Sequence, residues 1–227
     1  MLLISSFAWL GDAANWGGDA GIWARLVQHV LFTLAVVVAA SVIALPLGVA
    51  IGHTKRGRAV VTLASGAARA LPTLGLLTLF GLWLGIGLGA PFLALMVLAL
   101  PPLLAGAYAG IESADPATVD AARAIGMTEW QVVRNVEIPA ALPVISGGVR
   151  SAILQVAATA TLAAYTSDIG LGRFVFAGMK TNHFEEMIAG AILVMALTLF
   201  LSAFFWMMKR LTVAGLNRRE EEDVRAR

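Results

Sequence analysis

The chain has 227 residues, of which 59% are hydrophobic and only 13% are charged, and its formal net charge is +2. Because soluble domains carry roughly a quarter charged residues, this composition predicts an integral membrane protein. The small net charge argues against a nucleic-acid partner, and the absence of cysteine excludes disulfides and thiol catalysis.

The first ten residues are apolar, but the run is short and has no basic leader. We interpret them as an uncleaved segment at the membrane surface rather than a signal peptide. Trp9, Trp16 and Trp23 suit a membrane–water interface, where tryptophan is enriched.

Five apolar stretches are long enough to cross a membrane, since a spanning helix needs about 20 largely apolar residues. The expected fold is therefore all-α, as a single transmembrane domain over residues 1–227. The predicted spans are about 26–52, 59–84, 92–111, 143–165 and 187–208. An extra break near Pro72 or Pro101 would make six segments. The charged tail, residues 211–227, is expected to be solvated and frayed.

The basic residues predict how the spans are oriented. Twelve of the 16 Lys and Arg residues lie in the loop 53–58, in residues 112–142, at Arg150 or in the tail from Lys209. Three residues, Arg25, Arg173 and Lys180, lie on the other side. Because basic loops stay in the cytoplasm, the C-terminus is expected inside and the N-terminus outside.

Residues 112–142 are a polar interruption between apolar runs, which we call the hinge segment. Asp115 can cap a first helix, with Pro116 in its first turn. Gly126 can take the left-handed conformation that ends this helix, and a side chain there is expected both to strain the backbone and to fill space beside the helix crossing. Thr128 and Gln131 have the capping-box spacing for a second helix.

The second helix of the hinge segment is expected to stop near Ile138, because Pro139 disfavours helix in the residue before it. One apolar stripe is predicted along the two helices, formed by Val119, Ala122, Ile125, Trp130 and Val133. An apolar stripe outside the membrane needs a protein to cover it, so the hinge segment is predicted to be a docking surface.

The spacing inside the hinge segment is specific. Asp120-Ala121-Ala122 is followed by Gly126 and, after nine residues, by Val136-Glu137-Ile138-Pro139. This pattern resembles the E-A-A-x-x-x-G-x9-I-x-L-P loop of permease subunits of binding-protein-dependent ABC importers, with conservative changes at three positions. The alternative is an ordinary cytoplasmic helical hairpin.

The run from Ala158 to Gly172 is a second family-like stretch. Its small residues let helices approach closely, and its Gly-x-Gly permits a sharp return of the chain. It is similar to the T-L-A-A…G-L-G segment of compatible-solute permeases, which forms the outer end of the translocation path. In this sequence, Tyr165-Thr166-Ser167-Asp168 stands where Ile-Gly-Ala-Gly is more usual. A plain packing face is the alternative interpretation.

Arg69 lies about ten residues into the second predicted span, roughly 15 Å from its inner end. An arginine at that depth is costly unless it faces the bundle interior, water or a partner. It either lines the path or the dimer seam, or it snorkels to the inner headgroups. The residues assigned to the translocation path or gate are Arg69, Pro72, Thr159, Thr161, Tyr165 and Asp168.

The resemblance covers about residues 25–210 and is to the permease of a type I osmoprotectant ABC importer, of the glycine betaine, carnitine, choline and proline betaine group. It implies a bacterial plasma-membrane complex with a second permease copy or a homologous permease, cytoplasmic ATPases that bind ATP and Mg, and an extracytoplasmic binding protein. The residues that it implies at the ATPase contact are Asp120, Ala121, Ala122, Arg123, Ile125, Gly126, Met127, Thr128, Glu129 and Trp130.

Other functions find less support in the sequence. There is no P-loop and no catalytic set, so the chain is expected to be no enzyme and to hold no cofactor. His29, His53 and His183 have no metal-ligand spacing and are interpreted as isolated interfacial histidines. A methionine-importer permease, which shares the five-span plan, is the nearest alternative. A secondary transporter would need coupling carboxylates within the spans.

Overall fold

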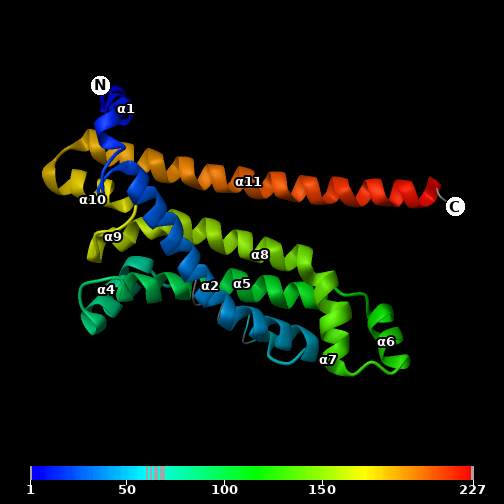
Figure 1. Ribbon diagram of the computed structural model, residues 1–227. Helices are drawn as coiled ribbons and strands as arrows, with labels where there is room; N and C mark the ends of the chain where they lie inside the picture. The colour runs from blue at the N-terminus through cyan, green and yellow to red at the C-terminus, as the bar shows by residue number, and fades with distance from the viewer. Residues whose placement is uncertain (1, 60, 62, 64–65, 67–69, 226–227) are drawn as a thin grey trace.

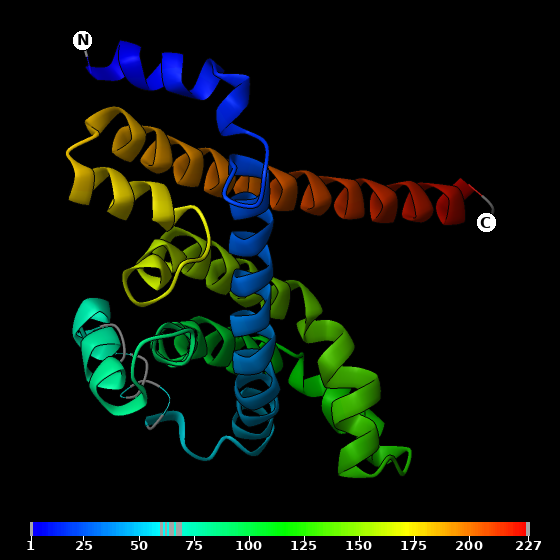
Figure 2. The same ribbon diagram turned by 60° about the vertical axis from the view of Figure 1, so that its left-hand side comes forward.

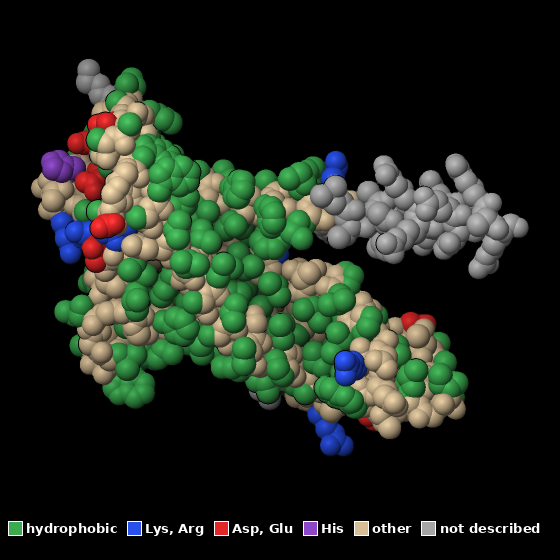
Figure 3. Space-filling view, in the orientation of Figure 1, with side chains coloured by type: hydrophobic (Ala, Val, Ile, Leu, Met, Phe, Trp, Pro, Cys, Tyr) green, Lys and Arg blue, Asp and Glu red, His purple; other side chains and the backbone are tan. Residues whose placement is uncertain are grey.

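The computed structural model describes residues 2–59, 61, 63, 66 and 70–225, with backbone alone for 209 and 211–225. All regular structure in these residues is helical. Within them, four helical stretches are long and apolar enough to cross a membrane: Ile22–Thr54, Gly89–Glu112, Glu129–Thr166 and Phe184–Met208. Charged side chains gather toward the ends of the visible face, with an apolar band between (Figure 3). The prediction of an all-α, multi-span membrane protein is confirmed.

Three long helices form the centre of the molecule: α5 packs against both α2 and α8, and α2 crosses in front of the other two in Figures 1 and 2. The helix α4 packs on α5, and α11 packs on α8, α10 and α1. The elements in chain order are α1 (Leu2–Gly11), η1 (Ala13–Asn15), α2 (Ile22–Thr54), α4 (Thr73–Leu84), α5 (Gly89–Glu112), α6 (Pro116–Ala124), α7 (Glu129–Val132), η2 (Val133–Glu137), α8 (Ile138–Thr159), η3 (Ala160–Leu162), α9 (Ala163–Thr166), α10 (Gly172–Thr181) and α11 (Phe184–Arg225).

Small residues bring the central helices into close contact. A Cβ added to Gly148 of α8 would lie 2.9 Å from the Cα of Gly106 on α5. A Cβ added to Gly48 of α2 would lie 2.5 Å from the Cβ of Ala107, on the same helix α5. Such contacts let backbones pack directly, which drives helix association in a membrane.

The prolines have different effects in different helices. Helix α5 runs without a break through Pro101 and Pro102. The second predicted span is not one helix: Leu71 and Pro72 lie outside helices, and α4 begins at Thr73. Pro72 has no N–H to donate and pushes the preceding residue out of helical geometry. Of the two extra breaks that the sequence allowed, the one at Pro72 is present and the one at Pro101 is not.

Polar contacts mark the two ends of the helix bundle. At one end, which we call the inner end, His53 of α2 contacts Glu137, at the start of α8. At the other end, the outer end, the N–H of Gly87 donates to the carbonyl of Thr166 at 3.0 Å, and the hydroxyl of Thr166 donates to the carbonyl of Gly87 at 3.2 Å. The chain therefore passes from the inner to the outer end between His53 and Gly87.

The two terminal segments are both helical in the described residues. At the N-terminus, α1 packs on α11, and the ring of Trp9 meets Phe174 edge-on at 5.4 Å. At the C-terminus, α11 continues as helix to Arg225, so the prediction of a frayed tail is wrong. Arginine, glutamate and alanine, which are common in this tail, are strong helix formers and extend the helix past the last apolar turn.

Candidate functional site

The first helix of the hinge segment, α6, starts at the predicted cap. Asp115 accepts hydrogen bonds from the N–H of Ala117 at 3.1 Å and from the hydroxyl of Thr118 at 3.0 Å, and Pro116 is in the first turn. Both bonds stabilise the charged carboxylate and therefore lower the pKa of Asp115, and the bond from Thr118 has the largest effect. The predicted cap is therefore confirmed, with Asp115 holding the charged form that a helix N-terminus favours.

The link to the second helix also follows the sequence signals. Gly126 has φ +89°, a conformation that few other residues adopt readily. The N–H of Gln131 donates to the hydroxyl oxygen of Thr128, and the N–H of Thr128 donates to Oε1 of Gln131 at 2.8 Å. This reciprocal pair is the predicted capping box.

The sequence predicted that the second helix stops near Ile138, but the helix continues through that residue. A π-helical turn, η2, follows α7, and the N–H of Ile138 donates to the carbonyl of Val133, five residues back. Helix α8 then begins with Pro139 in its first turn, where the missing N–H is not needed. The wider turn therefore accommodates the proline, and one helical run extends from Glu129 to Thr166.

The predicted apolar stripe is divided between two roles. Val119, Ala122 and Val133 are buried, and the first two pack with Val132 in a small core between α6 and α7. Ile125 and Trp130 are 76% and 69% exposed. The prediction of one continuous surface stripe is wrong, because α6 and the second helix fold against each other and bury their facing residues.

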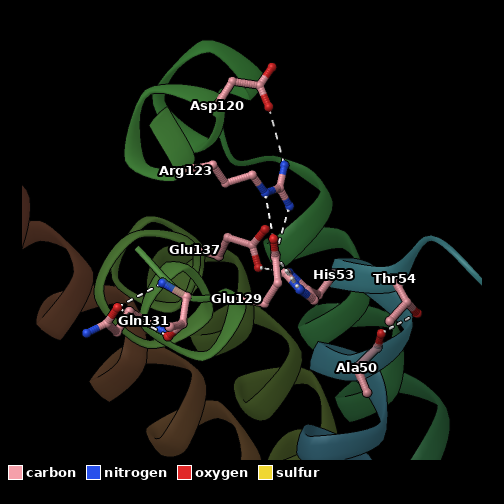
Figure 4. Close-up of polar contacts among 9 residues, drawn as sticks. Ala50, His53, Thr54, Asp120, Arg123, Glu129, Gln131 and Glu137 are labelled. Carbon is pink, nitrogen blue, oxygen red and sulfur yellow. Dashed lines mark hydrogen bonds and ion pairs between the residues drawn. The ribbon is translucent and has the colours of Figure 1, made fainter. Parts of the chain in front are cut away.

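An ion-pair network lies on the surface of the hinge segment (Figure 4). Arg123 contacts both oxygens of Glu129 at 3.0 Å and one oxygen of Asp120 at 3.3 Å. Its bonds to Glu129, and then to Asp120, raise the pKa of Arg123. The network joins α6 to α7 across Gly126, so it holds the angle between the two helices.

His53 connects this network to the transmembrane helix α2. Its Nδ1 lies 2.8 Å from an oxygen of Glu137, and its Nε2 lies 3.2 Å from an oxygen of Glu129 (Figure 4). Glu137 is buried in η2, with a side chain only 7% exposed. The interpretation of His53 as an isolated histidine is wrong, and nothing in the local sequence signals partners 76 and 84 residues away.

At the outer end, α2 holds the loop between α9 and α10. Arg25 pairs with the carboxylate of Asp168 at 3.0 Å and also donates to its backbone carbonyl. The N–H of Leu171 donates to Nδ1 of His29, whose Nε2 lies 2.8 Å from the carbonyl of Ala157 on α8. His29 is therefore buried between three segments and is not isolated, contrary to the sequence interpretation.

A family of known proteins matches residues 40–213, and it is described as the binding-protein-dependent transport system inner membrane component. The chain belongs to this family. The resemblance to importer permeases that the hinge motif indicated is confirmed, and so is the resemblance to the osmoprotectant group.

Named permeases align with most of this inner membrane component. The glycine betaine/carnitine/choline transport system permease protein of Bacillus subtilis is 32% identical over 195 residues, covering 86% of this chain and 90% of that protein. The osmoprotectant import permease protein of Salmonella typhimurium is 35% identical over 204 residues, covering 86% and 92%. The carnitine transport permease protein of Listeria monocytogenes is 35% identical over 166 residues, covering 73% and 74%.

Solved ABC transporters share the fold of this inner membrane component. An inward-facing methionine ABC transporter aligns with a TM-score of 0.71 at 23% identity, covering 84% of this chain and 95% of that one. An amino acid ABC transporter solved with histidines gives a TM-score of 0.63 at 22% identity, covering 83% and 92%. At these identities the similarity establishes the fold alone.

The residues assigned to the translocation path occupy different places in this inner membrane component. Arg69 lies outside the described residues. Pro72 is exposed before α4, and the hydroxyls of Thr159 and Thr161 donate to carbonyls of their own helical turns. Tyr165 and Asp168 are exposed at the outer end, and the ring of Tyr165 meets Phe176 edge-on at 5.7 Å.

The described part of the chain contains no group of three or more His, Asp or Glu side chains placed to hold a metal ion. His183 contacts the hydroxyl of Thr181 at 3.2 Å in an exposed turn. The two polar assemblies, at the hinge segment and at the outer loop, are therefore built from hydrogen bonds and ion pairs.

Proposed function

We propose that this chain is the membrane-spanning permease subunit of an ATP-driven importer for compatible solutes, such as glycine betaine, choline, carnitine or proline betaine. The observation that carries the proposal is the alignment, at 32–35% identity over 73–86% of the chain, with permeases named for these solutes. The chain supplies the path, and the energy comes from ATP and Mg bound by a separate ATPase subunit.

The hinge segment is the proposed contact with that ATPase. Ile125 and Trp130 present large apolar side chains to solvent at the inner end, and a protein groove is the environment that would bury them. Asp120, Arg123 and Glu129 surround them with paired charges. An apolar centre with a polar rim is the usual composition of a protein interface.

Movement of the ATPase would reach the membrane by two routes. The first is the helical run from Glu129 to Thr166, which joins the hinge segment directly to the outer end. The second is His53, which ties Glu129 and Glu137 to α2. A rotation of the hinge segment would therefore tilt α8 and α2 together.

The outer end is the proposed substrate side. Tyr165 lies there at the end of α9, and Asp168 lies in the loop that precedes α10. An extracytoplasmic binding protein would deliver solute to this face. The complex would contain a second permease, in a bacterial plasma membrane, with the N-terminus outside. Arg69 remains a candidate for the path or the dimer seam, and Pro72 for the path or gate.

The test is transport by the reconstituted complex. The permease, its ATPase and its binding protein are placed in liposomes, and uptake of labelled glycine betaine, choline, carnitine and methionine is measured with ATP inside. Uptake of a quaternary-ammonium solute that requires all three components supports the proposal. Uptake of methionine alone, or uptake without the ATPase, would contradict it.

A further inference from the structure

Three polar side chains lie on one face of α2, a helix that is otherwise strongly apolar. Arg25, Gln28 and His29 have the spacing i, i+3 and i+4, which places them together at the outer end of the helix. All three bind residues 167–171, which we call the outer loop. We call the three side chains the clasp.

The clasp holds the outer loop mainly through its backbone. Arg25 binds both the carbonyl and the carboxylate of Asp168. Oε1 of Gln28 accepts from the N–H of Gly170 at 3.2 Å and from Arg25 at 3.1 Å. Nδ1 of His29 accepts from the N–H of Leu171 at 3.3 Å. Because Nε2 of His29 faces a carbonyl, it must carry the proton, which leaves Nδ1 free to accept.

The contacts of the clasp leave one buried polar atom without a hydrogen-bond partner. The side chain of Arg25 is only 7% exposed, yet its Nε has no hydrogen-bond partner. Its carboxylate partner, Asp168, is 67% exposed and also binds Arg173 at 2.7 Å. A buried guanidinium with an unsatisfied donor carries a desolvation cost that water would relieve if the loop moved away.

The outer loop has an irregular backbone. Ser167 is extended, Gly170 has φ +71°, and a Cβ at Gly170 would lie 3.0 Å from Nδ1 of His29. The loop thus lies close against α2 at this position, and the imidazole of His29 would have to shift by a few tenths of an ångström to admit a Cβ there. The side chain of Asp168 is 67% exposed, so its bonds to Arg25 can be exchanged for bonds to water.

We propose that the clasp is a latch: it positions the outer loop against α2 when the outer end is closed, and it must release the loop once in every transport cycle. The inference rests on the proposed importer function, and it names the contact whose opening admits solute from the outer side. Arg25, Gln28 and His29 act as positioning residues, since they hold the loop and not the solute.

A disulfide across the latch tests the requirement for release. A Cβ at Gly170 would lie 3.5 Å from the Cβ of His29, within the range of natural disulfides. The chain has no cysteine of its own, so the double variant His29→Cys and Gly170→Cys gives one defined crosslink. Oxidation should abolish solute uptake in the reconstituted complex, and a reductant should restore it. Equal uptake by the oxidised and reduced forms would overturn the latch while leaving the importer function standing.

A matched crosslink at the same end serves as control. Leu84→Cys and Gly89→Cys place a pair with a Cβ separation of 3.9 Å within one turn, between α4 and α5. This disulfide does not connect α2 with the outer loop, so oxidation should leave uptake unchanged. Equal losses in both oxidised pairs would attribute the effect to oxidation and overturn the assignment.

A second measurement does not depend on uptake by the crosslinked variant. Ile169→Cys provides a single reporter in the outer loop, and its reaction with a maleimide is followed with and without Gln28→Ala. Loss of the bond to Gly170 should raise the reaction rate about threefold to tenfold, the factor expected for one net hydrogen bond. An unchanged rate would mean that the clasp does not control the loop.

Discussion

Gly126 determines the angle between α6 and α7 through its backbone alone. Its φ is +89°, and a Cβ added there would meet no atom within 4 Å. The expectation that a side chain would also fill packing space is therefore wrong for this chain. Gly126→Ala should cost about 1 kcal/mol of local strain, and Gly126→Asn less, because asparagine tolerates left-handed geometry better.

ATPase copurification with the tagged permease measures the effect, and Gly126→Ala should reduce it more than Gly126→Asn. Gly147→Ala is the matched control, because Gly147 also has open space around it but lies within α8 with ordinary helical geometry. Equal yields from the two Gly126 variants would show that this backbone conformation does not matter for docking.

His53 has one buried partner and one exposed partner, and the two should differ in energetic importance. His53→Ala leaves the carboxylate of Glu137 buried without its partner, which should cost about 1–3 kcal/mol. Glu129→Gln should cost much less, because the side chain of Glu129 is 59% exposed and water replaces the lost contact. Thermal unfolding of the purified permease measures both.

A double variant separates pairing from general damage at His53. In His53→Ala with Glu137→Gln, no buried charge is left unpaired, so the loss should be smaller than the sum of the two single losses. Strict additivity of the two changes would mean that His53 and Glu137 do not interact, contrary to the 2.8 Å contact.

At the residue scale, the sequence predicts what depends on near neighbours. The cap at Asp115, the turn at Gly126 and the capping box at Thr128 each involve partners within three residues or a single backbone angle. His29 and His53 are different, because their partners are 76 to 142 residues away. Such contacts exist only after the helices pack, so local spacing carries no signal of them.

At the scale of elements, the hinge segment separates its stability from its docking surface. Val132 is fully buried between α6 and the second helix, whereas Ile125 and Trp130 are exposed. Val132→Ala should lower stability by about 2 kcal/mol through lost burial and a cavity. Trp130→Ala should leave the melting temperature nearly unchanged and reduce ATPase copurification, because exposed hot-spot tryptophans act through a partner.

The melting temperature and ATPase copurification should therefore change independently, and Ile125→Ala should behave like Trp130→Ala. If Trp130→Ala lost stability and kept the ATPase, the exposed face would be structural and the proposed interface would be in the wrong place. Ala117→Ser is a useful reference, since Ala117 is exposed on α6 and only its backbone N–H takes part in the cap.

The prolines show why local sequence rules do not always predict where a helix ends. Pro139 was expected to end a helix, yet the π-helical turn η2 lets the run continue into α8. Pro101 lies inside α5, which continues through it without a break. Pro72 does break the chain. The outcome depends on the groups packed around each proline, which are not local in sequence.

At the scale of the whole molecule, the contacts at the two ends of the bundle indicate how often the chain crosses the bilayer. His53 lies at the inner end with Glu137, and Gly87 lies at the outer end with Thr166. The chain between them has 33 intervening residues, enough for one crossing of about 20 residues with a break at Pro72. A fifth crossing there, beside the four long helical stretches of the described residues, stays a prediction, and it would place the termini on opposite sides.

The distribution of charge predicts the orientation of these crossings, and this prediction is open to direct measurement. Basic residues predominate at the inner end and in the tail, whereas Arg25 and Arg173 at the outer end are both paired with Asp168. A cysteine at Asp12 should react with a membrane-impermeant maleimide added to intact cells, and one at Thr118 should react only after permeabilisation. A fluorescent reporter fused at the C-terminus should be active in the cytoplasm. Labelling of Thr118→Cys from outside would place the hinge segment away from any ATPase and would contradict the docking proposal together with the topology.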